Sequence, residues 1–331
     1  MKKIYQYCLL ILSLVSSQVL ANSAEQQPLA SKSLMLDVLS LDADTLIAAG
    51  ERGHIIRSSD GVNWQQQEVP TQSTITKLFF IDENIGWAVG HDSLILKTQD
   101  GGITWQLQNF KPDLQRPLFD VYFVDENQGI AVGAYGFMYR TTNGGDTWQR
   151  EHHLELLNED DQYYLEDLKQ EDPEFYQEEI ASILPHFNSL TMHQGVLYLA
   201  GEVGLMAKSN DFGRNWQLMD EIYIGSFFDI KATNNNVLIA AGLRGNLFYR
   251  AAEQANWQRA DVDSIALLNN IVTTDTGRLF VLGNAGVILS SDDGQQFTLT
   301  TQADGKALMA GVWFKNQLVV ASENGMKILD L

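Results

Sequence analysis

The sequence predicts an all-β fold, a seven-bladed β-propeller with four-stranded blades, and three observations carry this prediction. A unit of about forty residues occurs seven times along the chain. Each unit holds short runs rich in Val, Ile, Phe and Tyr between Gly, Asp and Asn, as strands and turns do. Most units also carry a turn motif that closes on an aromatic residue. Four strands of about five residues fill such a unit, and radial packing lets each blade cover its neighbours.

The repeat is marked by an apolar run that ends in Gly or Ser, followed by a short turn and a second apolar run. These ends are spaced by 40, 43, 68, 41, 41 and 39 residues and fall at Gly50, Gly90, Gly133, Gly201, Gly242, Gly283 and Ser322. The second and third units are the most alike, since 78–90 and 121–133 share eight of thirteen residues. In the second unit we expect strands over 76–81, 86–90, 94–98 and 105–109. A two-sheet sandwich is the alternative arrangement of the same strands.

The turn motif has the chemistry of a hairpin turn. An Asp or Asn side chain accepts backbone N–H groups, Gly supplies a positive φ, and the closing aromatic packs under the turn. We assign this structural role to Asp60, Asp100, Asn143, Asp211 and Asp292, with the closing tryptophans Trp64, Trp105, Trp148 and Trp216. Because the aromatic recurs at one place, it indicates repeated packing rather than binding.

The ends of the chain suggest how the ring closes and where the protein works. The seventh unit stops after its third strand, so we expect 26–33 to occupy the outer place of that blade, upstream of a first strand over 34–41. Residues 1–24 read as a cleavable signal peptide, with Lys2 and Lys3 before an apolar run and small residues after it; an uncleaved anchor is the alternative. We therefore expect a propeller over 25–331 that is periplasmic or otherwise secreted and has no membrane span after cleavage.

The charge of the chain is concentrated in one enlarged interval. The protein has 42 acidic and 22 basic residues and a formal charge of -20, which excludes nucleic-acid binding. Residues 151–185, between the third and fourth units, contain twelve acidic residues and one lysine. Apolar spacing predicts a helix over 154–168 and a second short helix over 174–184. A solvated loop is the alternative to our hypothesis of an acidic, partly helical lid that recruits a basic partner segment through Glu159, Asp160, Asp161, Glu166, Asp167, Glu171 and Asp172.

The turn motif resembles the Asp box, or BNR repeat, of sialidases and of many non-enzymatic propellers. The fuller unit, with Asp-Glu-Asn-x-Gly-Trp-Ala-Val-Gly over 82–90 and Asp-Gly-Gly-x-Thr-Trp over 100–105, is similar to the photosystem II stability/assembly-factor family and to its relatives in bacteria that do not photosynthesise. The similarity runs over about 34–331. It implies a secreted seven-bladed propeller that binds a membrane-protein partner during assembly or stabilisation. The arginine patch of the photosynthetic members is matched here only by Arg52 and Arg244.

The turns between the second and third strands of the blades ring one mouth of such a propeller. They form the best candidate surface by geometry, and ordinary exposed turn residues are the alternative. The residues that we assign to partner binding are Glu51, Arg52, His91, Tyr135, Glu202, Arg244, Asn284 and Asn324.

Catalytic motifs are not evident in the sequence. The Arg-Ile-Pro segment of sialidases, the Gly-x-Ser-x-Gly elbow, phosphate loops and paired cysteine ligands are all missing. His152 and His153 beside Glu151 and Glu155 suggest a metal site less strongly than a solvated charge run. We therefore expect no cofactor, no metal and no enzyme activity. The leading hypothesis is a scaffold for a membrane protein or its extracytoplasmic segment, and an Asp-box glycoside hydrolase is the alternative.

Overall fold

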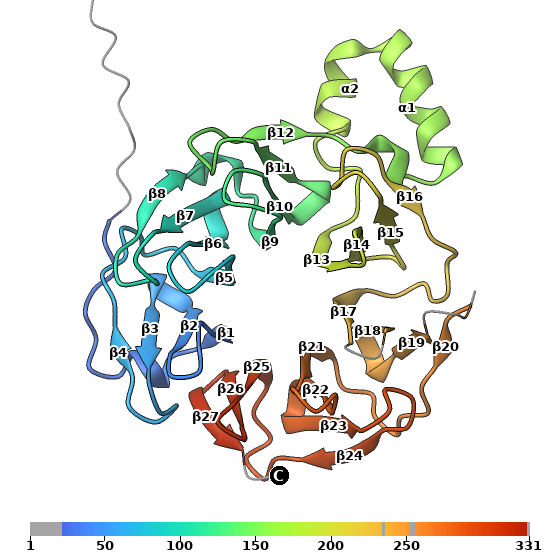
Figure 1. The fold of residues 1–331 in the computed structure, drawn as a ribbon. Coiled ribbons are helices and arrows are strands. Elements are labelled where there is room, and N and C mark those ends of the chain that lie inside the picture. The colour runs from blue at the N-terminus through green and yellow to red at the C-terminus, as the bar shows by residue number, and fades with distance from the viewer. Residues whose placement is uncertain (1–21, 234–235, 252–253, 255, 330–331) are drawn as a thin grey trace, which may run out of the picture.

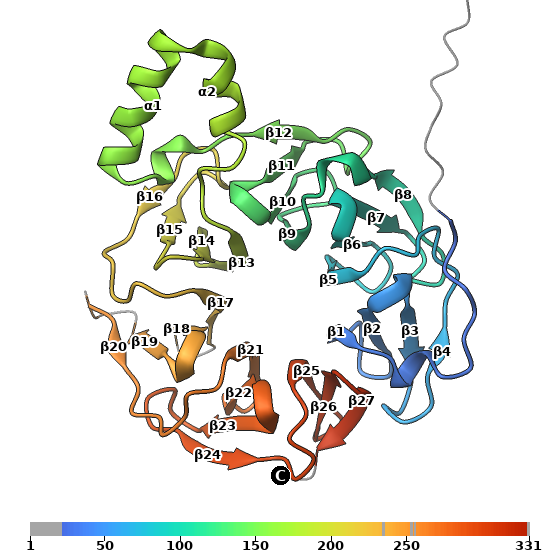
Figure 2. The ribbon, with the colours of Figure 1, turned by 180° about the vertical axis from the view of Figure 1, so that it is seen from behind.

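The computed structural model describes residues 22–233, 236–251, 254 and 256–329, and it confirms the predicted propeller. Seven antiparallel sheets surround a central opening, with the first strand of each sheet innermost; Figures 1 and 2 show the ring from its two sides. Within the described residues, six blades have four strands and the seventh has three. The predicted signal peptide falls largely on residues 1–21 and lies outside the described residues.

The blades follow one another in chain order, and two of them flank the helical insertion. Blades 1 to 3 comprise β1 (Met35–Ser40), β2 (Leu46–Gly50), β3 (Ile55–Ser58), β4 (Gln65–Gln66); β5 (Ile75–Phe80), β6 (Gly86–Gly90), β7 (Leu94–Thr98), β8 (Gln106–Asn109); and β9 (Leu118–Phe123), β10 (Gly129–Gly133), β11 (Met138–Thr141), β12 (Gln149–Glu151). Blades 4 and 5 comprise β13 (Phe187–His193), β14 (Val196–Gly201), β15 (Met206–Ser209), β16 (Gln217–Leu218); and β17 (Phe227–Ala232), β18 (Val237–Gly242), β19 (Leu247–Ala251), β20 (Gln258–Arg259). Blades 6 and 7 comprise β21 (Leu268–Thr273), β22 (Leu279–Gly283), β23 (Val287–Ser291), β24 (Thr298–Thr301); and β25 (Leu308–Phe314), β26 (Gln317–Ser322), β27 (Gly325–Leu329).

The second strand of every blade ends at the residue that the repeat predicted, from Gly50 in β2 to Ser322 in β26. Steric contact explains the glycines, because a Cβ at Gly50 would overlap the carbonyl oxygen of Leu34 in the approach to the first strand. The same overlap occurs between Gly90 and Thr74. A glycine therefore lets two backbones approach where the second strand ends.

The Asp-box turns have the predicted hydrogen bonds, with one correction. Asp60 Oδ1 accepts the backbone N–H groups of residues 62 and 63, and the indole of Trp64 donates to Gly61 O at 3.0 Å. In blade 6, Asp293 accepts the equivalent bonds, from Gln295 and Gln296 at 2.8 Å each, so the assignment of Asp292 is wrong. The motif there is one residue shorter than assumed. The side chain of Asp292 is 87% exposed and pairs with Arg278.

A belt of side chains joins the blades around the central opening. Each belt position follows the bulge in the first strand of its blade, and the belt comprises Asp37, Lys77, Asp120, Ser189, Asp229, Asn270 and Ala310. Most of these side chains accept a backbone N–H of the next blade: Leu78 donates to Asp37 at 2.9 Å and Leu190 donates to Asp120 at 2.7 Å. The belt therefore fixes the angular position of neighbouring blades through bonds that are largely sheltered from water.

The ring closes by apolar packing between blades 7 and 1. Met35 and Val38 of β1 pack with Phe314 and Val319 of blade 7 in one buried cluster, which Ala30 also joins. The prediction that 26–33 fill the outer place of blade 7 is wrong. Residue 24 instead bonds to Val69 of blade 1, and the 3₁₀ turn Ala30–Lys32 lies against β27. The segment thus links the two blades without adding a strand.

The insertion is helical, as predicted, and is packed against the ring. It comprises a 3₁₀ turn at Leu154–Leu156, α1 (Glu159–Glu171) and α2 (Pro173–Glu179). Asn158 caps α1 by accepting from Asp161 N, and Asp172 caps α2 by accepting from Phe175 N. Leu157, Leu165 and Leu184 are buried with Trp216 in the cluster between blades 3 and 4. Among the described residues, no helix has the length and apolar character needed to cross a membrane.

Candidate functional site

The predicted partner-binding residues all lie in turns between the second and third strands, at one end of the propeller. Arg52, His91, Arg244 and Asn324 are exposed, whereas Glu51, Glu202 and Asn284 are half-buried and Tyr135 is 39% exposed. Arg52, Tyr135 and Arg244 adopt the left-handed conformation, with φ of 56°, 56° and 57°. This geometry is that of tight hairpin turns that hold their side chains at the rim of the mouth.

The two arginines do not form one patch. Arg52 lies on blade 1 and Arg244 on blade 5, and Figure 1 shows these blades on opposite sides of the central opening. Neither guanidinium is ion-paired within the part of the chain that the structure describes. An arginine-rich patch of the kind that the resemblance implied is therefore not assembled from these two positions.

Two other predicted residues, Tyr135 of blade 3 and Glu202 of blade 4, are brought together through His186. The ring of Tyr135 lies 4.7 Å from the ring of His186, and His186 Nδ1 bonds to the carboxylate of Glu202. The guanidinium of Arg116 lies over the ring of Tyr135, 4.2 Å from its centre. We call Arg116, Tyr135, His186 and Glu202 the mouth cluster. It offers a cation, an aromatic surface and a carboxylate within one small area, which suits recognition of a peptide segment.

Arg116 and His186 were missed by the sequence reasoning. Both lie in connections that enter the first strand of a blade, just before β9 and β13, whereas the candidate list considered only the hairpin turns. The available signal was topological, since these connections emerge at the same end of the propeller as those turns. The insertion borders the cluster too, because Arg116 Nη2 donates to Ala181 O at 3.4 Å and Leu184 lies against Gly136.

The helices of the insertion lie outside the ring, beyond β12 and β16, in both Figures 1 and 2. They flank blades 3 and 4 and leave the central opening uncovered, so "lid" describes their position poorly. Asp161 and Asp172 are engaged at the helix caps. The other acidic residues of the predicted set are exposed, namely Glu159, Asp160, Glu166, Asp167 and Glu171. The insertion thus presents an acidic edge outside the ring at blades 3 and 4, and its role in binding stays a prediction.

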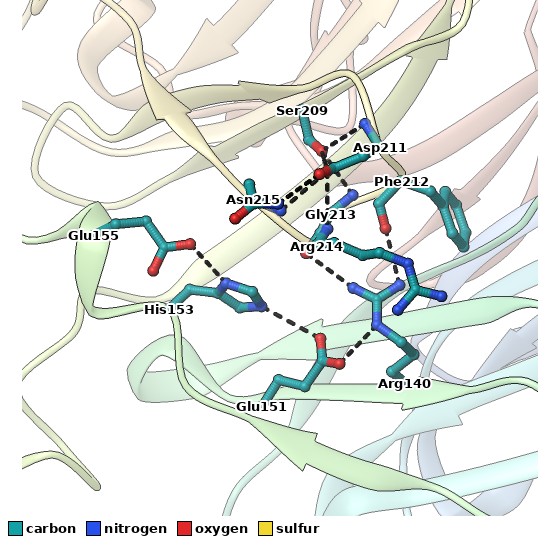
Figure 3. Close-up of polar contacts among 10 residues, drawn as sticks. All are labelled: Arg140, Glu151, His153, Glu155, Ser209, Asp211, Phe212, Gly213, Arg214 and Asn215. Carbon is teal, nitrogen blue, oxygen red and sulfur yellow. Dashed lines mark hydrogen bonds and ion pairs between the residues drawn. The ribbon is translucent and has the colours of Figure 1, made fainter.

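A buried ionic network anchors the base of the insertion, as Figure 3 shows. Arg140 Nε bonds to Glu151 at 2.7 Å, and its two terminal nitrogens donate to the carbonyl oxygens of Phe212 and Gly213 at 2.8 Å each. His153 is buried and contacts Glu151 at 3.3 Å and Glu155 at 2.9 Å. Burial opposes ionisation of Glu151, but its bonds to Arg140 and His153 outweigh burial and lower its pKa. The His152–His153 region is therefore not the solvated charge run that we expected.

The belt also carries perturbed ionisable groups. Burial raises the pKa of Asp120 to about 7, against the opposing effects of Lys77 and of the backbone N–H groups of Leu190 and Val121. Burial lowers the pKa of Lys231. Burial also opposes the charge on Lys77, but the carboxylates of Asp37, Asp120 and Asp229 outweigh it and raise its pKa. Inter-blade bonding accounts for Asp120 and Lys77, whereas Lys231 lies two residues after the belt position of blade 5 and is affected chiefly by burial.

Comparison with known proteins shows that the chain is similar in sequence to photosystem II assembly proteins. The family model described as photosynthesis system II assembly factor YCF48 matches residues 56–115. The photosystem II assembly protein Ycf48 of Thermosynechococcus vestitus is 31% identical over 231 residues, which is 69% of this chain and 59% of that protein. The chain thus aligns with less than two thirds of that relative's length. The chloroplastic photosystem II stability/assembly factor HCF136 of Cyanidioschyzon merolae is 41% identical over 58 residues, 17% of this chain and 13% of that protein.

Solved structures share the fold at low sequence identity. YCF48 bound to D1 peptide matches with a TM-score of 0.65 at 17% identity and covers 92% of this chain and 94% of that one. YCF48 from Cyanidioschyzon merolae gives the same TM-score and identity, with coverage of 92% and 98%. The β-propeller domain of Cps50 (Swd1) from Myceliophteria thermophila has a TM-score of 0.64 at 11% identity, with coverage of 93% and 98%. Since the identities are 17% or lower, these likenesses bear on the fold alone.

Proposed function

We propose, from the premise that this chain is a β-propeller of the photosystem II assembly factor-like family, that it is a scaffold which binds a segment of a membrane protein and assists the assembly or stability of a membrane complex. We further propose that it acts in the periplasm or otherwise outside the cytoplasm, after removal of the signal peptide read in residues 1–24. The solved relative described as bound to D1 peptide supports the class of partner.

The observation that carries this proposal is the mouth cluster. Its aromatic ring contacts both a guanidinium and an imidazole, and the ring remains 39% exposed. An aromatic residue fixed in this way loses little conformational entropy on binding, which favours an interaction hot spot. Arg116 contacts the ring, and Glu202 is joined to it through His186, so one positive and one negative group would orient a bound peptide backbone or its polar side chains.

The acidic edge of the insertion supports a partner with basic character. The exposed carboxylates of α1 belong to the insertion, whose residues Ala181 and Leu184 adjoin the mouth cluster, and the protein as a whole carries a formal charge of -20. Carboxylates on an exposed helix gain little from one pairing, but together they steer a basic segment toward the neighbouring site. In this proposal the insertion raises the association rate and the mouth cluster holds the bound segment.

The test is capture of membrane proteins from envelope extracts by the mature chain. The double variant Arg116→Ala/Tyr135→Ala should lose the captured protein, while His91→Ala, in the same turn of blade 2, should retain it. Neutralising the exposed carboxylates of α1 with Gln and Asn, with both caps kept, should weaken capture at low salt and have little effect at high salt. Equal capture by the native protein and the double variant would refute the mouth cluster as the site. Hydrolysis of fluorogenic sialosides by the pure protein would favour the glycosidase alternative.

The location is tested separately. Expression of the full chain in a bacterial host should give an exported protein whose N-terminus lies near residue 22 or 25. The measurement is intact mass after cell fractionation. Recovery of the uncleaved chain from the cytoplasm would overturn the secretion proposal.

A further inference from the structure

A second concave surface lies at the opposite end of the propeller from the mouth cluster. It is a groove of about 740 Å³ across blades 2, 3 and 4, formed where β5, β9 and β13 end and where the Asp-box turn of blade 4 begins. Aromatic and apolar side chains line it, chiefly Phe79, Tyr122, Phe123, Met192 and Phe212. Phe79 and Tyr122 have ring centres 4.9 Å apart, and Phe212 lies 6.4 Å from Tyr122. We call this surface the aromatic groove.

Phe212 occupies a position that the repeat otherwise gives to glycine. The Asp boxes of blades 2 and 3 have Gly101 and Gly144 there, with φ of 70° and 69°. Phe212 adopts the same left-handed conformation, with φ of 58°. A non-glycine residue in this conformation costs roughly 1 kcal/mol or more. The chain thus retains backbone strain at the residue whose ring forms one wall of the groove.

Packing accounts for part of this arrangement. Phe212 lies near the guanidinium of Arg140, 5.8 Å from ring to cation, and Figure 3 shows it beside Asp211 and Gly213. It also adjoins the buried cluster between blades 3 and 4. Its ring nevertheless stays partly exposed, lies 6.4 Å from the ring of Tyr122 and lines the groove. An aromatic residue at a strained surface position, facing other aromatic residues across a groove, indicates a contact with something outside the chain.

The rim of the aromatic groove is acidic. The lining residues Ile81 and Val124 are each followed directly by Asp-Glu, at 82–83 and 125–126, and Asp211 itself lines the groove, whereas the lining residues include no lysine or arginine. Three of these carboxylates serve the turns: Asp82, Asp125 and Asp211 accept backbone N–H groups. Glu83 and Glu126 are exposed, and their side chains have no hydrogen bond or ion pair within the described residues. They belong to the Asp-Glu-Asn motif, and the turn itself does not use them.

Three cations lie on the elements around the groove, and none of them forms an ion pair with Glu83 or Glu126 within the described residues. Arg140 is buried and bonds to Glu151 and to two carbonyl oxygens. Lys97 donates to Gly144 O at 2.9 Å. Arg214 follows the Asp-box turn and is exposed. The negative charge of Glu83 and Glu126 is therefore not neutralised by a buried partner.

We propose that the aromatic groove is a docking site for a protein segment that carries aliphatic or aromatic side chains flanked by lysine or arginine. The apolar side chains of the segment enter between Tyr122 and Phe212, and its cations lie against Glu83 and Glu126. Charge complementarity selects this occupant, because an acidic or neutral apolar segment would leave the two carboxylates without a partner. This site is separate from the mouth cluster, since the two lie at opposite ends of the strands. The propeller can then hold two segments at once.

The test is fluorescence anisotropy with a short fluorescein-labelled peptide of Lys, Leu, Phe and Gly, added to the mature full-length protein. The double variant Glu83→Lys/Glu126→Lys should weaken Kd by at least about tenfold. Phe212→Gly should do the same while the melting temperature stays equal or rises, because glycine relieves the strain. The matched control is Asp275→Lys/Asp292→Lys, which makes the same change of charge at the same end of the propeller on blade 6. It should change Kd by no more than about twofold.

Two further measurements locate the peptide. Benzoylphenylalanine in place of Val124, a 43% exposed residue of the groove, should cross-link the bound peptide. Arg116→Ala/Tyr135→Ala should leave the affinity for the peptide unchanged, so a failure of the mouth cluster and a failure of this groove are distinguishable. The proposal is overturned if the native protein does not bind the peptide, if both charge-reversal variants weaken binding equally, or if Phe212→Gly keeps full affinity. A peptide with Glu in place of Lys should not bind, and equal binding of that peptide also counts against the proposal.

Discussion

The seam between blades 7 and 1 and the seam between blades 3 and 4 solve the same packing problem with different chemistry. The buried part of the closing seam is apolar: Met35 and Val38 meet Phe314 and Val319, and its belt position is Ala310, which has no side-chain acceptor. Its polar contacts are at the surface, where Lys315 bonds to Asp44 and to Ser59 O. The other seam holds the ionic network of Arg140, the insertion, an acidic belt residue and a strained aromatic. The difference teaches that closure relies on non-directional burial, while polar and strained features gather at a seam that closure does not depend on.

The largest expected effect is at the closing seam. Phe314→Ala removes a buried side chain where the ring joins, and it should lower the free energy of unfolding by about 3–5 kcal/mol. The measurement is urea unfolding followed by tryptophan fluorescence. The matched change Leu165→Ala, at a buried position of α1, should chiefly increase protease cleavage within 155–182. Equal losses of global stability in the two variants would break the comparison.

The ionic network of the other seam should come next. Arg140→Met keeps the apolar stem but leaves Glu151 and two carbonyl oxygens without their donor, at an expected cost of about 2–3 kcal/mol. The measurement is again urea unfolding, with proteolysis of the insertion as a second readout. Arg150→Met on the same strand pair is the control, because Arg150 forms no ion pair within the described residues. If both variants are equally stable, the network does not anchor this seam.

The belt gives a prediction about pH. The folded protein holds the pKa of Asp120 at about 7, above the ordinary value of 3.8, so folding takes up a proton at this group between those values. Stability should therefore fall as the pH rises from 5 to 8, by on the order of 2 kcal/mol. Asp120→Asn should remove this dependence. Asp125→Asn should keep it, since hydrogen bonds from Gln128 and Asn127 lower the pKa of that exposed group. An unchanged pH profile in Asp120→Asn would contradict the assignment.

The smallest effect is expected from the strained turn. Phe212→Gly should raise stability by roughly 1 kcal/mol if relief of the backbone outweighs the loss of ring contacts. The reverse change, Gly144→Phe in the Asp box of blade 3, should destabilise the protein, because a side chain there meets the carbonyl oxygen of Glu126. Thermal melts of the two variants measure both effects. A loss of stability in Phe212→Gly would mean that packing, rather than an external contact, retains this residue.

The regular part of the fold was predictable because its cause is local. Gly50 and Gly90 stand where a Cβ would strike the preceding backbone, and that steric requirement repeats in blades 1 to 6. The strands of the second unit were placed to within one residue, as β5 begins at Ile75 and β8 begins at Gln106. The helices of the insertion followed from apolar spacing, although α1 starts later than expected.

The predictions that were wrong, and the residues that were missed, mostly involve contacts between repeat units. The segment before β1 does not complete blade 7. Residues 24–27 form hydrogen bonds with blade 1, and Ala30 packs in the apolar cluster that blades 7 and 1 share. The mouth cluster joins residues from two connections and two turns, and no single unit contains it. Asp293 was missed because the Asp box of blade 6 is one residue shorter than the Asp boxes of blades 2 to 4.

Among the described residues, blades 7 and 1 share no strand, and this has a consequence for biosynthesis. The ribosome delivers β1 to β24 before β25 to β27, so the apolar surfaces of blades 1 and 6 remain open to water until the last segment emerges. Until then the nascent chain is an open ring whose two ends expose apolar surface. Resistance to proteases should therefore appear in one step, when residues 308–329 dock, and a chain that stops before them presents the surfaces that quality-control proteases and holdases recognise.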